Sequence, residues 1–246
     1  AVEGAVVASF ANTGQLCISI ERIYVEAPLA EAFTDAFGAR AAALRLGAEQ
    51  AYGPEVGALA SAAQLDKVRT HVEDAVAKGA RLVTGGHHRP DIGPLFYEPT
   101  VLTDVTPDME LYRDETFGPV VAVYPVASDD EAVAQVNDSE YGLNASVYCG
   151  DTSRGRAIAE RIQAGTVNVN DGYSSAWASL DAPMGGMKAS GVGRRHGREG
   201  LLKYTESQTV AVRSRLAEKL QDPTGDPAGY ARRFTAILRK AKHLPR

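Results

Sequence analysis

Cysteine is scarce in this sequence, whose 246 residues contain only Cys17 and Cys149. Two cysteines so far apart do not make the disulfide framework of a small secreted domain. This cysteine usage is typical of a reducing compartment, so we expect a cytoplasmic protein without structural disulfides. Each cysteine is then explained either by packing or by the chemistry of its thiol.

Long apolar runs and an excess of positive charge are also missing. No apolar stretch reaches the roughly 20 residues that a membrane-spanning helix needs, and the formal net charge is -5. We therefore expect neither membrane insertion nor binding to nucleic acid. The sequence starts at Ala1, without methionine or a recognisable signal peptide, inside a pattern of small apolar residues. We expect a fragment of a longer protein that forms one large domain or two small ones.

A metal site is not expected either. His87 and His88 are adjacent in a loop rich in glycine and proline, but no acidic residue or cysteine near them has the spacing of metal ligands. We interpret this segment as a solvated loop.

Strands alternate with helices along most of the chain. Aliphatic and β-branched residues predict strands at residues 19–26, 80–84, 97–102, 120–126, 143–149 and 165–170. Apolar residues at helical spacing predict helices at residues 28–46, 62–78, 129–137, 153–163 and 196–204. This alternation predicts an α/β fold in which helices cover both faces of a sheet. Because Cys149 falls within an alternating strand pattern, we interpret it as a packing residue.

The remaining segments are less regular. Residues 172–193 form a long glycine-containing loop, and loops of this length within a domain are usually functional. Residues 205–212 alternate polar and apolar side chains, which predicts a strand, and residues 222–227 resemble a linker. A final amphipathic helix from about Tyr230 carries arginine and lysine outside its apolar face. Docking of this helix on its own protein and binding to a partner or an anionic surface are both open.

Cys17 ends a small, polar segment between a predicted helix end and a predicted strand. Its small neighbours Thr13 and Gly14 leave room for a substrate to approach the sulfur. A thiolate in such a place is a nucleophile, whereas a buried cysteine is an inert packing residue. The segment taken alone is compatible with both interpretations.

Two further motifs favour the nucleophile. Together with Gly14-Gln15-Leu16-Cys17, the segments at residues 115–121 (Glu-Thr-Phe-Gly-Pro-Val-Val) and 183–194 (Pro-Met-Gly-Gly-Met-Lys-Ala-Ser-Gly-Val-Gly-Arg) resemble the catalytic half of the NAD(P)-dependent aldehyde dehydrogenases. The resemblance covers residues 1–212 and is strongest to succinate-semialdehyde dehydrogenases. It implies a three-layer αβα catalytic domain at residues 1–204 with a mostly parallel sheet. It also implies an oligomerisation strand at residues 205–213, which joins a sheet of a neighbouring subunit, and a helical tail at residues 214–246.

The resemblance implies roles for three residues. Cys17 attacks the aldehyde carbon, and its own backbone N–H is one donor to the oxyanion. Glu115 matches the glutamate that hydrogen-bonds the nicotinamide ribose, and Phe117 matches the aromatic residue that holds the nicotinamide ring. Hydride transfer to NAD or NADP then leaves a thioester on Cys17.

For the substrate, the resemblance implies contacts from Trp177, Ser179 and Met184. Ser179 matches a serine that contacts the carboxylate of succinate semialdehyde, and Met184 replaces a phenylalanine of the pocket wall. Ala11 stands where related enzymes carry an arginine that pairs with this carboxylate. Succinate semialdehyde is therefore the expected substrate, and a neutral aldehyde is the alternative.

Several parts of such an enzyme are missing from this sequence. The general-base glutamate, the oxyanion asparagine and the Rossmann domain belong to the other half, and no Gly-x-Gly-x-x-Gly fingerprint follows a predicted strand. We therefore expect the catalytic half of a homo-oligomeric enzyme, a dimer or tetramer, without its cofactor domain and inactive alone. A non-catalytic structural derivative of the fold is the alternative. The residues that choose between NAD and NADP lie outside the sequence.

Overall fold

The computed structural model of this protein describes residues 1–49, 52–212 and 225–242. Residues Ala1–Tyr204 form one compact unit and residues Thr205–Arg246 form a second. None of the helices in the described ranges combines the length and the apolar character needed to cross a membrane.

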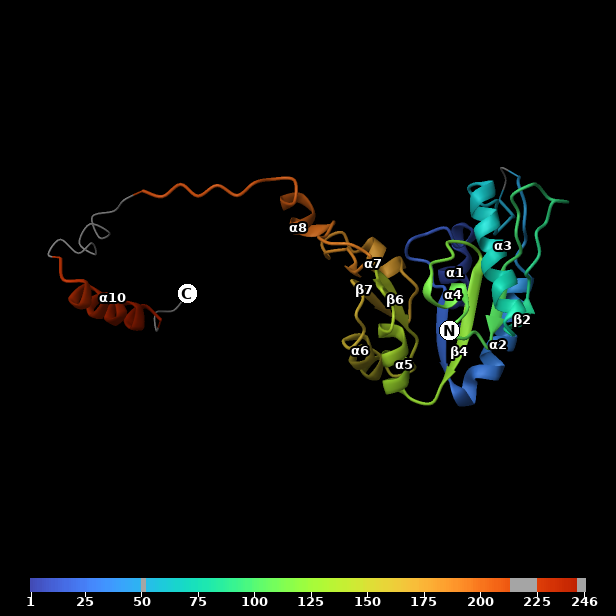
Figure 1. Cartoon of the computed structure of the whole chain (residues 1–246), viewed down its shortest axis with the longest axis horizontal. Helices are drawn as coiled ribbons and strands as arrows, with labels where there is room; N and C mark the ends of the chain where they lie inside the picture. Colours follow the sequence, from blue (N-terminus) through green and yellow to red (C-terminus); the bar gives the residue numbers. More distant parts are fainter. Residues whose placement is uncertain (50–51, 213–224, 243–246) are drawn as a thin grey trace. The chain divides into compact units, whose positions relative to one another are not determined.

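The first unit contains most of the regular structure (Figure 1). Its helices are α1 (Val2–Phe10), the 3-10 helix η1 (Ala11–Gly14), α2 (Ala27–Ala42), α3 (Ala62–Ala77), α4 (Glu110–Arg113), α5 (Asp129–Asn137), α6 (Thr152–Ala159), α7 (Ser174–Ala178) and α8 (Gly197–Leu202). Its strands are β1 (Arg22–Glu26), β2 (Arg81–Thr84), β3 (Thr100–Thr103), β4 (Val120–Val126), β5 (Tyr141–Gly142), β6 (Asn144–Val147), β7 (Thr166–Val169) and β8 (Met187–Lys188).

The main sheet has four strands in the order β1-β4-β3-β2. Strand β4 pairs in parallel with β1 and β3, with Tyr24 opposite Tyr124 and Val101 opposite Val121. Strand β2 pairs with β3 in the antiparallel direction. A parallel pair, β6 and β7, and a short antiparallel pair, β5 and β8, make two smaller sheets. The predicted α/β fold with mostly parallel pairing is confirmed.

Helices pack on both faces of the main sheet because successive side chains of a strand point to opposite faces. On β4, Val121 and Val123 belong to the core cluster that contains Phe10 of α1 and Phe37 of α2, whose rings stack at 5.7 Å. The alternate β4 residues, Val120, Ala122 and Tyr124, pack with Leu65, Val68 and Val72 of α3. These two cores make the three layers of the fold.

The predicted loop at residues 172–193 is more ordered than expected. It contains helix α7 and strand β8, and Met184 forms an isolated antiparallel bridge with Arg195. The prediction of an irregular segment was therefore wrong in part. Neither element has the length at which sequence periodicity becomes recognisable, since α7 spans 5 residues and β8 spans 2.

The predicted position of Cys149 inside a strand also needs correction. Strand β6 ends at Val147, and Cys149 follows it with a partly exposed side chain. Its backbone is held by the Asn170 side chain, whose Oδ1 accepts the Cys149 N–H at 2.8 Å and whose Nδ2 donates to the Cys149 carbonyl at 2.9 Å. This side-chain pairing replaces the strand ladder at that point.

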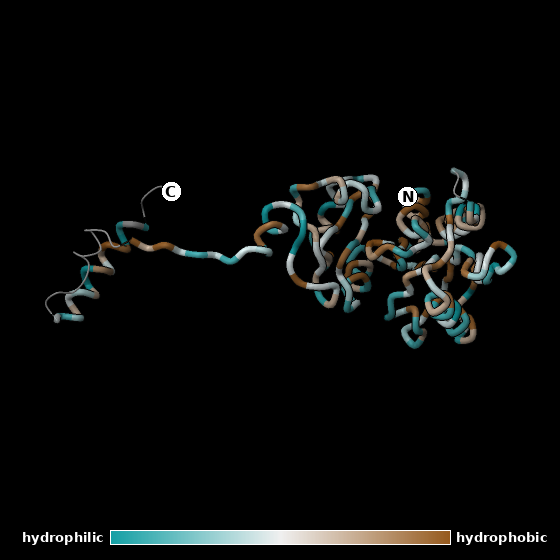
Figure 2. Tube along the Cα trace, turned by 90° about the horizontal axis from the view of Figure 1, so that it is seen from above, coloured by the Kyte–Doolittle hydropathy of each residue, from teal (hydrophilic) through white to brown (hydrophobic). Residues whose placement is uncertain are grey.

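In the second unit, residues 205–212 are exposed and have no assigned helix or strand in this single chain. Their pairing with a neighbouring subunit stays a prediction. Helix α10 (Pro227–Ala241) is capped by Asp226, whose carboxylate accepts the Gly229 N–H at 3.0 Å. Polar and apolar stretches alternate along this helix (Figure 2), as the predicted amphipathic pattern requires. The predicted linker lies partly outside the described residues.

Candidate functional site

The loop that carries Cys17 connects α1 to β1 and exposes the thiol. Asn12, Thr13 and Gly14 adopt φ angles of 52°, 61° and 69°, a left-handed run that is uncommon for residues with side chains. A Cβ atom on Gly14 would lie 2.1 Å from the carbonyl oxygen of Gly118. Only glycine fits at this contact, so the first motif lies directly against the second.

Side chains of the same loop fasten it to the segment before α3. Thr13 Oγ1 accepts the Gly57 N–H at 3.0 Å, and Gln15 Oε1 accepts the Ala60 N–H at 2.8 Å. The Nε2 of Gln15 donates to the carbonyl of Ala58 at 3.3 Å. The loop is thus held in place while Cys17 stays accessible, which is the arrangement that an attacking thiol needs.

The loop of the second motif is clamped from two sides. The carboxylate of Glu21, directly before β1, accepts the N–H groups of Thr116 at 2.8 Å and Phe117 at 2.9 Å. From α3, Gln64 Nε2 donates to the carbonyls of Thr116 and Phe117, both at 2.8 Å. These bonds hold Phe117 at a φ angle of 55°. Glu21 and Gln64 were not predicted, because nothing local to either residue in the sequence indicates its partner.

Burial shapes the electrostatics of this clamp. It raises the pKa of Glu21, the two backbone N–H bonds oppose that rise, and the charge of Glu115 adds to it. His71 Nδ1 lies 3.0 Å from Thr116 Oγ1. Burial lowers the pKa of His71, and the charge of Lys67 lowers it further. The neutral imidazole is therefore favoured beside the loop.

Glu115 differs from Glu21 in its surroundings. Its carboxylate is exposed and has no hydrogen bond or ion pair with any residue that the structure describes. Phe117, two residues later, is half-buried. Glu115 and Cys17 both line a cavity of about 710 Å³ that is bordered by β1, α5 and β6. The other candidate residues do not line this cavity.

A hydrogen-bond network connects the Cys17 loop to the segment that leads into α7. Asn144 Nδ2 donates to the carbonyl of Ile18 at 3.0 Å and to the carbonyl of Gly172 at 3.2 Å. The Gly172 carbonyl also accepts from Ser146 Oγ at 2.8 Å and from Asn168 Nδ2 at 3.0 Å. The residue after Cys17 and the beginning of the α7 segment are thus fixed through one asparagine.

Helix α7 is fixed at its beginning by Asp171. The Asp171 carboxylate accepts the Ser174 hydroxyl at 2.7 Å and the Ser175 N–H at 2.6 Å. Burial alone would raise the pKa of Asp171, but these hydrogen bonds outweigh it and lower the pKa to about 2. Ser179, at the end of α7, donates its hydroxyl to the Ser175 carbonyl at 2.7 Å.

Two of the predicted substrate residues meet at Arg195. The guanidinium of Arg195 lies over the Trp177 ring, 5.4 Å from its centroid. Backbone hydrogen bonds of 2.7 Å in both directions join Arg195 to Met184. Trp177 and Ser179 are exposed and Met184 is half-buried. Arg195 was not among the predicted site residues, because its contact with Trp177 depends on the reversal of the chain between them.

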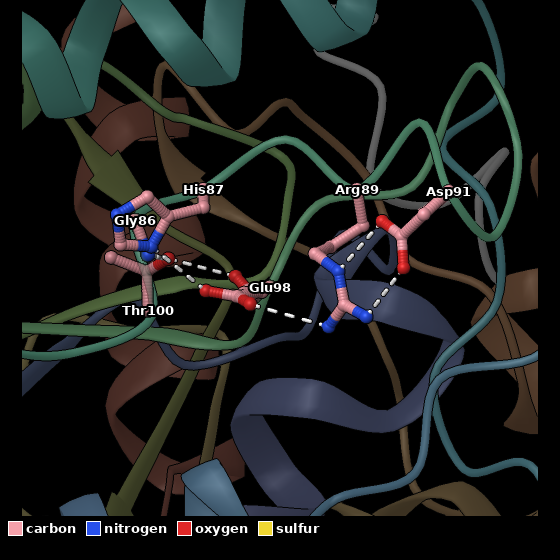
Figure 3. Close-up of polar contacts among 6 residues, drawn as sticks. All are labelled: Gly86, His87, Arg89, Asp91, Glu98 and Thr100. Carbon is pink, nitrogen blue, oxygen red and sulfur yellow. Dashed lines mark hydrogen bonds and ion pairs between the residues drawn. The ribbon is translucent and has the colours of Figure 1, made fainter.

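In the loop that contains His87 and His88, basic side chains pair with acidic ones (Figure 3). His87 Nδ1 lies 3.0 Å from Glu98 Oε2, and Arg89 reaches both Glu98 and Asp91, at 3.3 Å and 2.7 Å. The Gly86 N–H donates to the Thr100 hydroxyl at 2.9 Å. In the part of the chain that the structure describes, no group of three or more histidine, cysteine, aspartate or glutamate residues could hold a metal ion.

The fold and the three motifs together define an aldehyde dehydrogenase domain. The model of the aldehyde dehydrogenase family matches residues 1–210, so the chain belongs to this family.

Similar proteins agree with this assignment. The chain is 57% identical over 239 residues to "Putative succinate-semialdehyde dehydrogenase [NADP(+)] 2" of Mycobacterium tuberculosis (strain ATCC 25618 / H37Rv), a match that covers 97% of this chain and 46% of the relative. The structure of Mycobacterium tuberculosis aldehyde dehydrogenase complexed with NAD+ is 33% identical, with a TM-score of 0.79, and the match covers 84% of this chain and 42% of that one. The structure of succinate-semialdehyde dehydrogenase from Burkholderia pseudomallei is 40% identical, with a TM-score of 0.76, and the match covers 82% of this chain and 41% of that one. The chain thus spans about half the length of the relatives it matches.

Proposed function

We propose that the protein containing this chain oxidises succinate semialdehyde to the carboxylic acid, and that this chain supplies the catalytic half. The names of the similar proteins support this reaction, and the name of the 57% identical relative favours NADP over NAD. In this proposal, residues 1–204 are the catalytic domain, residues 205–213 an oligomerisation strand and residues 214–246 a tail. The observation that carries the proposal is the contact of Gly14 with Gly118, which packs the Cys17 loop on the Phe117 loop.

Cys17 is the nucleophile of this reaction. Its thiolate attacks the aldehyde carbon and forms a tetrahedral adduct, and its own backbone N–H is one of the oxyanion donors. The exposure of the thiol and the fastening of the loop through Thr13 and Gln15 support this role. When bound, the nicotinamide group would accept the hydride that leaves the adduct. The thioester that remains on the sulfur would then be hydrolysed by water, which releases the carboxylic acid and restores the thiol.

Glu115 and Phe117 fit the nicotinamide end of such a cofactor. The Glu115 carboxylate has no partner among the described residues and is exposed, so it can accept hydrogen bonds from ribose hydroxyls. Phe117 is held by its backbone at both N–H and carbonyl, so that its ring presents a fixed apolar surface. Trp177, Ser179 and Met184 lie in the segment that would contact the substrate.

The proposal includes a cytoplasmic homo-oligomer. Residues 205–212 are exposed and alternate polar and apolar side chains, which suits the addition of a strand to the sheet edge of another subunit.

Turnover by the full-length protein tests the reaction. Purified protein is incubated with succinate semialdehyde and NADP or NAD, and the reduced cofactor is followed by absorbance. We expect turnover that Cys17→Ala abolishes and that the matched variant Cys149→Ala retains. Butanal is assayed in parallel, because Ala11 offers no charge to a carboxylate and a neutral aldehyde is the alternative substrate. Turnover that survives Cys17→Ala would contradict the proposed mechanism, and faster turnover of butanal would contradict the proposed substrate.

A further inference from the structure

The segment from β8 to the end of α8 is a basic region in an acidic protein. It contains four cationic side chains and one carboxylate, namely Lys188, Arg194, Arg195 and Arg198 against Glu199, whereas the whole chain has a net charge of -5. The cations have different partners. Lys188 Nζ donates to the carbonyls of Asn137 and Ser139, and Arg194 donates to the carbonyls of Gly186 and Gly193. These two side chains therefore hold the backbone.

The Arg195 side chain does not hold the backbone in this way. It is exposed and pairs with no carboxylate or carbonyl within the described ranges, although carboxylates pair with Arg113 and Arg154 elsewhere in the fold. Its contact is the Trp177 ring, where a cation–π interaction fixes the plane of the guanidinium without using its N–H donors. A guanidinium oriented in this way is prepared to bind a planar carboxylate with two parallel hydrogen bonds.

The backbone of Arg195 is fixed as well. Two hydrogen bonds of 2.7 Å join it to Met184 in an antiparallel bridge. Trp177 is carried by α7, which Asp171 holds at its beginning. Hydrogen bonds thus hold the backbone that carries Arg195 and Trp177, so the position of the guanidinium beside Trp177 and Met184 is defined.

We propose that Arg195 binds the carboxylate of the substrate, with Trp177 orienting its guanidinium, and so selects aldehydes that carry a negative charge. The inference rests on the proposed function. It assigns to Arg195 the positive charge that Ala11 does not supply. The ligand class is a short aliphatic carboxylate with an aldehyde at its other end. No bond to Arg195 forms or breaks in the reaction, so its effect is on substrate binding.

Steady-state kinetics of the full-length protein test the inference with two aldehydes of equal chain length. Arg195→Gln should raise KM for succinate semialdehyde about ten- to hundredfold, as expected for a lost charge-assisted hydrogen bond, and leave kcat/KM for butanal within about twofold. Arg195→Lys should recover part of the loss, because it keeps the charge and loses the fork of donors. Arg198→Gln, an exposed arginine on α8, is the matched control and should leave both substrates unaffected. An unchanged KM for succinate semialdehyde in Arg195→Gln, or an equal loss with butanal, would overturn the inference.

A binding experiment separates this inference from the proposed reaction. Trp177 is the single tryptophan of this chain, so its emission, obtained as the difference between wild type and Trp177→Phe, reports on Arg195 directly. Titration with succinate should change this emission in a saturable way in the wild type and not in Arg195→Gln, while butyramide should have no effect. Absence of turnover with a saturable succinate response would reject the proposed reaction and support the anion site. Absence of the succinate response would reject the anion site even in an active dehydrogenase.

Discussion

At the scale of single residues, the clamp at Glu21 shows why a charged side chain lies inside the fold. Thr116 and Phe117 present two backbone N–H groups to the same place, and each oxygen of the Glu21 carboxylate accepts one of them. An uncharged amide offers only one acceptor oxygen, and its NH₂ group would face the second N–H. A buried N–H without a partner is costly, so the carboxylate is retained although burial disfavours its charge.

Glu21→Gln should therefore lower the free energy of unfolding by about 1–3 kcal/mol, because one buried N–H loses its acceptor. Denaturant unfolding measures the loss, and hydrogen exchange should show faster exchange of the Thr116 and Phe117 amides. Glu31→Gln, an exposed glutamate on α2, is the matched control and should change stability by less than about 0.5 kcal/mol. Equal exchange rates at residues 116–117 in both variants would show that the clamp does not hold the loop.

The two cysteines should differ in reactivity. Cys17 is exposed on a fastened loop, whereas Cys149 is partly covered and its backbone is bound by Asn170. Under limited alkylation of the folded protein, followed by peptide mass mapping, we expect Cys17 to be labelled first, since access to the thiol limits the reaction. In denaturant the two rates should become similar. Faster labelling of Cys149 in the folded state would remove Cys17 from its proposed role.

At the scale of secondary-structure elements, the long periodic segments were predictable and the short ones were not. Strand β4 and helix α5 have the predicted bounds. Ser128 caps α5, with its Oγ accepting the Glu131 N–H at 3.2 Å. Helix α7 depends on Asp171, which lies outside the helix, and on the network around Gly172. Contacts between distant segments carry no local signal in one sequence, so Glu21, Asn144 and Arg195 could not be predicted.

The stability that Asp171 contributes to α7 should depend on pH. The Asp171 pKa of about 2 in the folded protein lies below the usual aspartate value of 3.8, so the stabilisation that this residue contributes is complete above pH 4 and is lost as the pH falls toward 2. Asp171→Asn should remove this contribution, about 0.5–2 kcal/mol as for other helix caps, and should flatten the acid limb of the stability curve. Thermal unfolding followed by Trp177 emission between pH 2 and 6 measures both effects.

Asp181→Asn is the control for this experiment, because Asp181 is exposed and its side chain has no hydrogen bond or ion pair to the described residues. The control should keep the wild-type acid limb. An Asp171→Asn protein with the same acid limb as wild type would show that the carboxylate does not stabilise α7.

At the scale of the whole molecule, the chain is half as long as its relatives, and it exposes apolar side chains on the α7–α8 segment. Leu180, Val192 and Leu201 are 71%, 101% and 70% exposed. Large apolar side chains exposed to this extent are a feature of protein–protein interfaces. This is consistent with the proposal that the catalytic half functions together with further protein.

We accordingly expect the 246-residue chain by itself to give no sustained reduction of NAD or NADP with either aldehyde. Glu115 and Phe117 would hold only the nicotinamide end of the cofactor, and correct positioning of reactants contributes about 7–11 kcal/mol to lowering a barrier. The measurement is absorbance of the reduced cofactor with the purified chain, and the full-length protein is the positive control. Turnover by the chain that depends on Cys17 would show that it binds the cofactor productively without a second domain.

The pairing of β1 with β4 has a consequence for the order of events during synthesis. Glu21 and Thr116 are separated by 95 residues, and at a ribosomal rate of 5–20 residues per second their segments emerge on the order of ten seconds apart. Among the residues that the structure describes, β1 pairs with β4, so this pairing waits until β4 is available. The closure of so long a loop also slows the search for native contacts. Cys17 is thus translated before the strand that completes the sheet beside it, so a nascent chain that stalls before residue 126 carries Cys17 without the β1–β4 pairing.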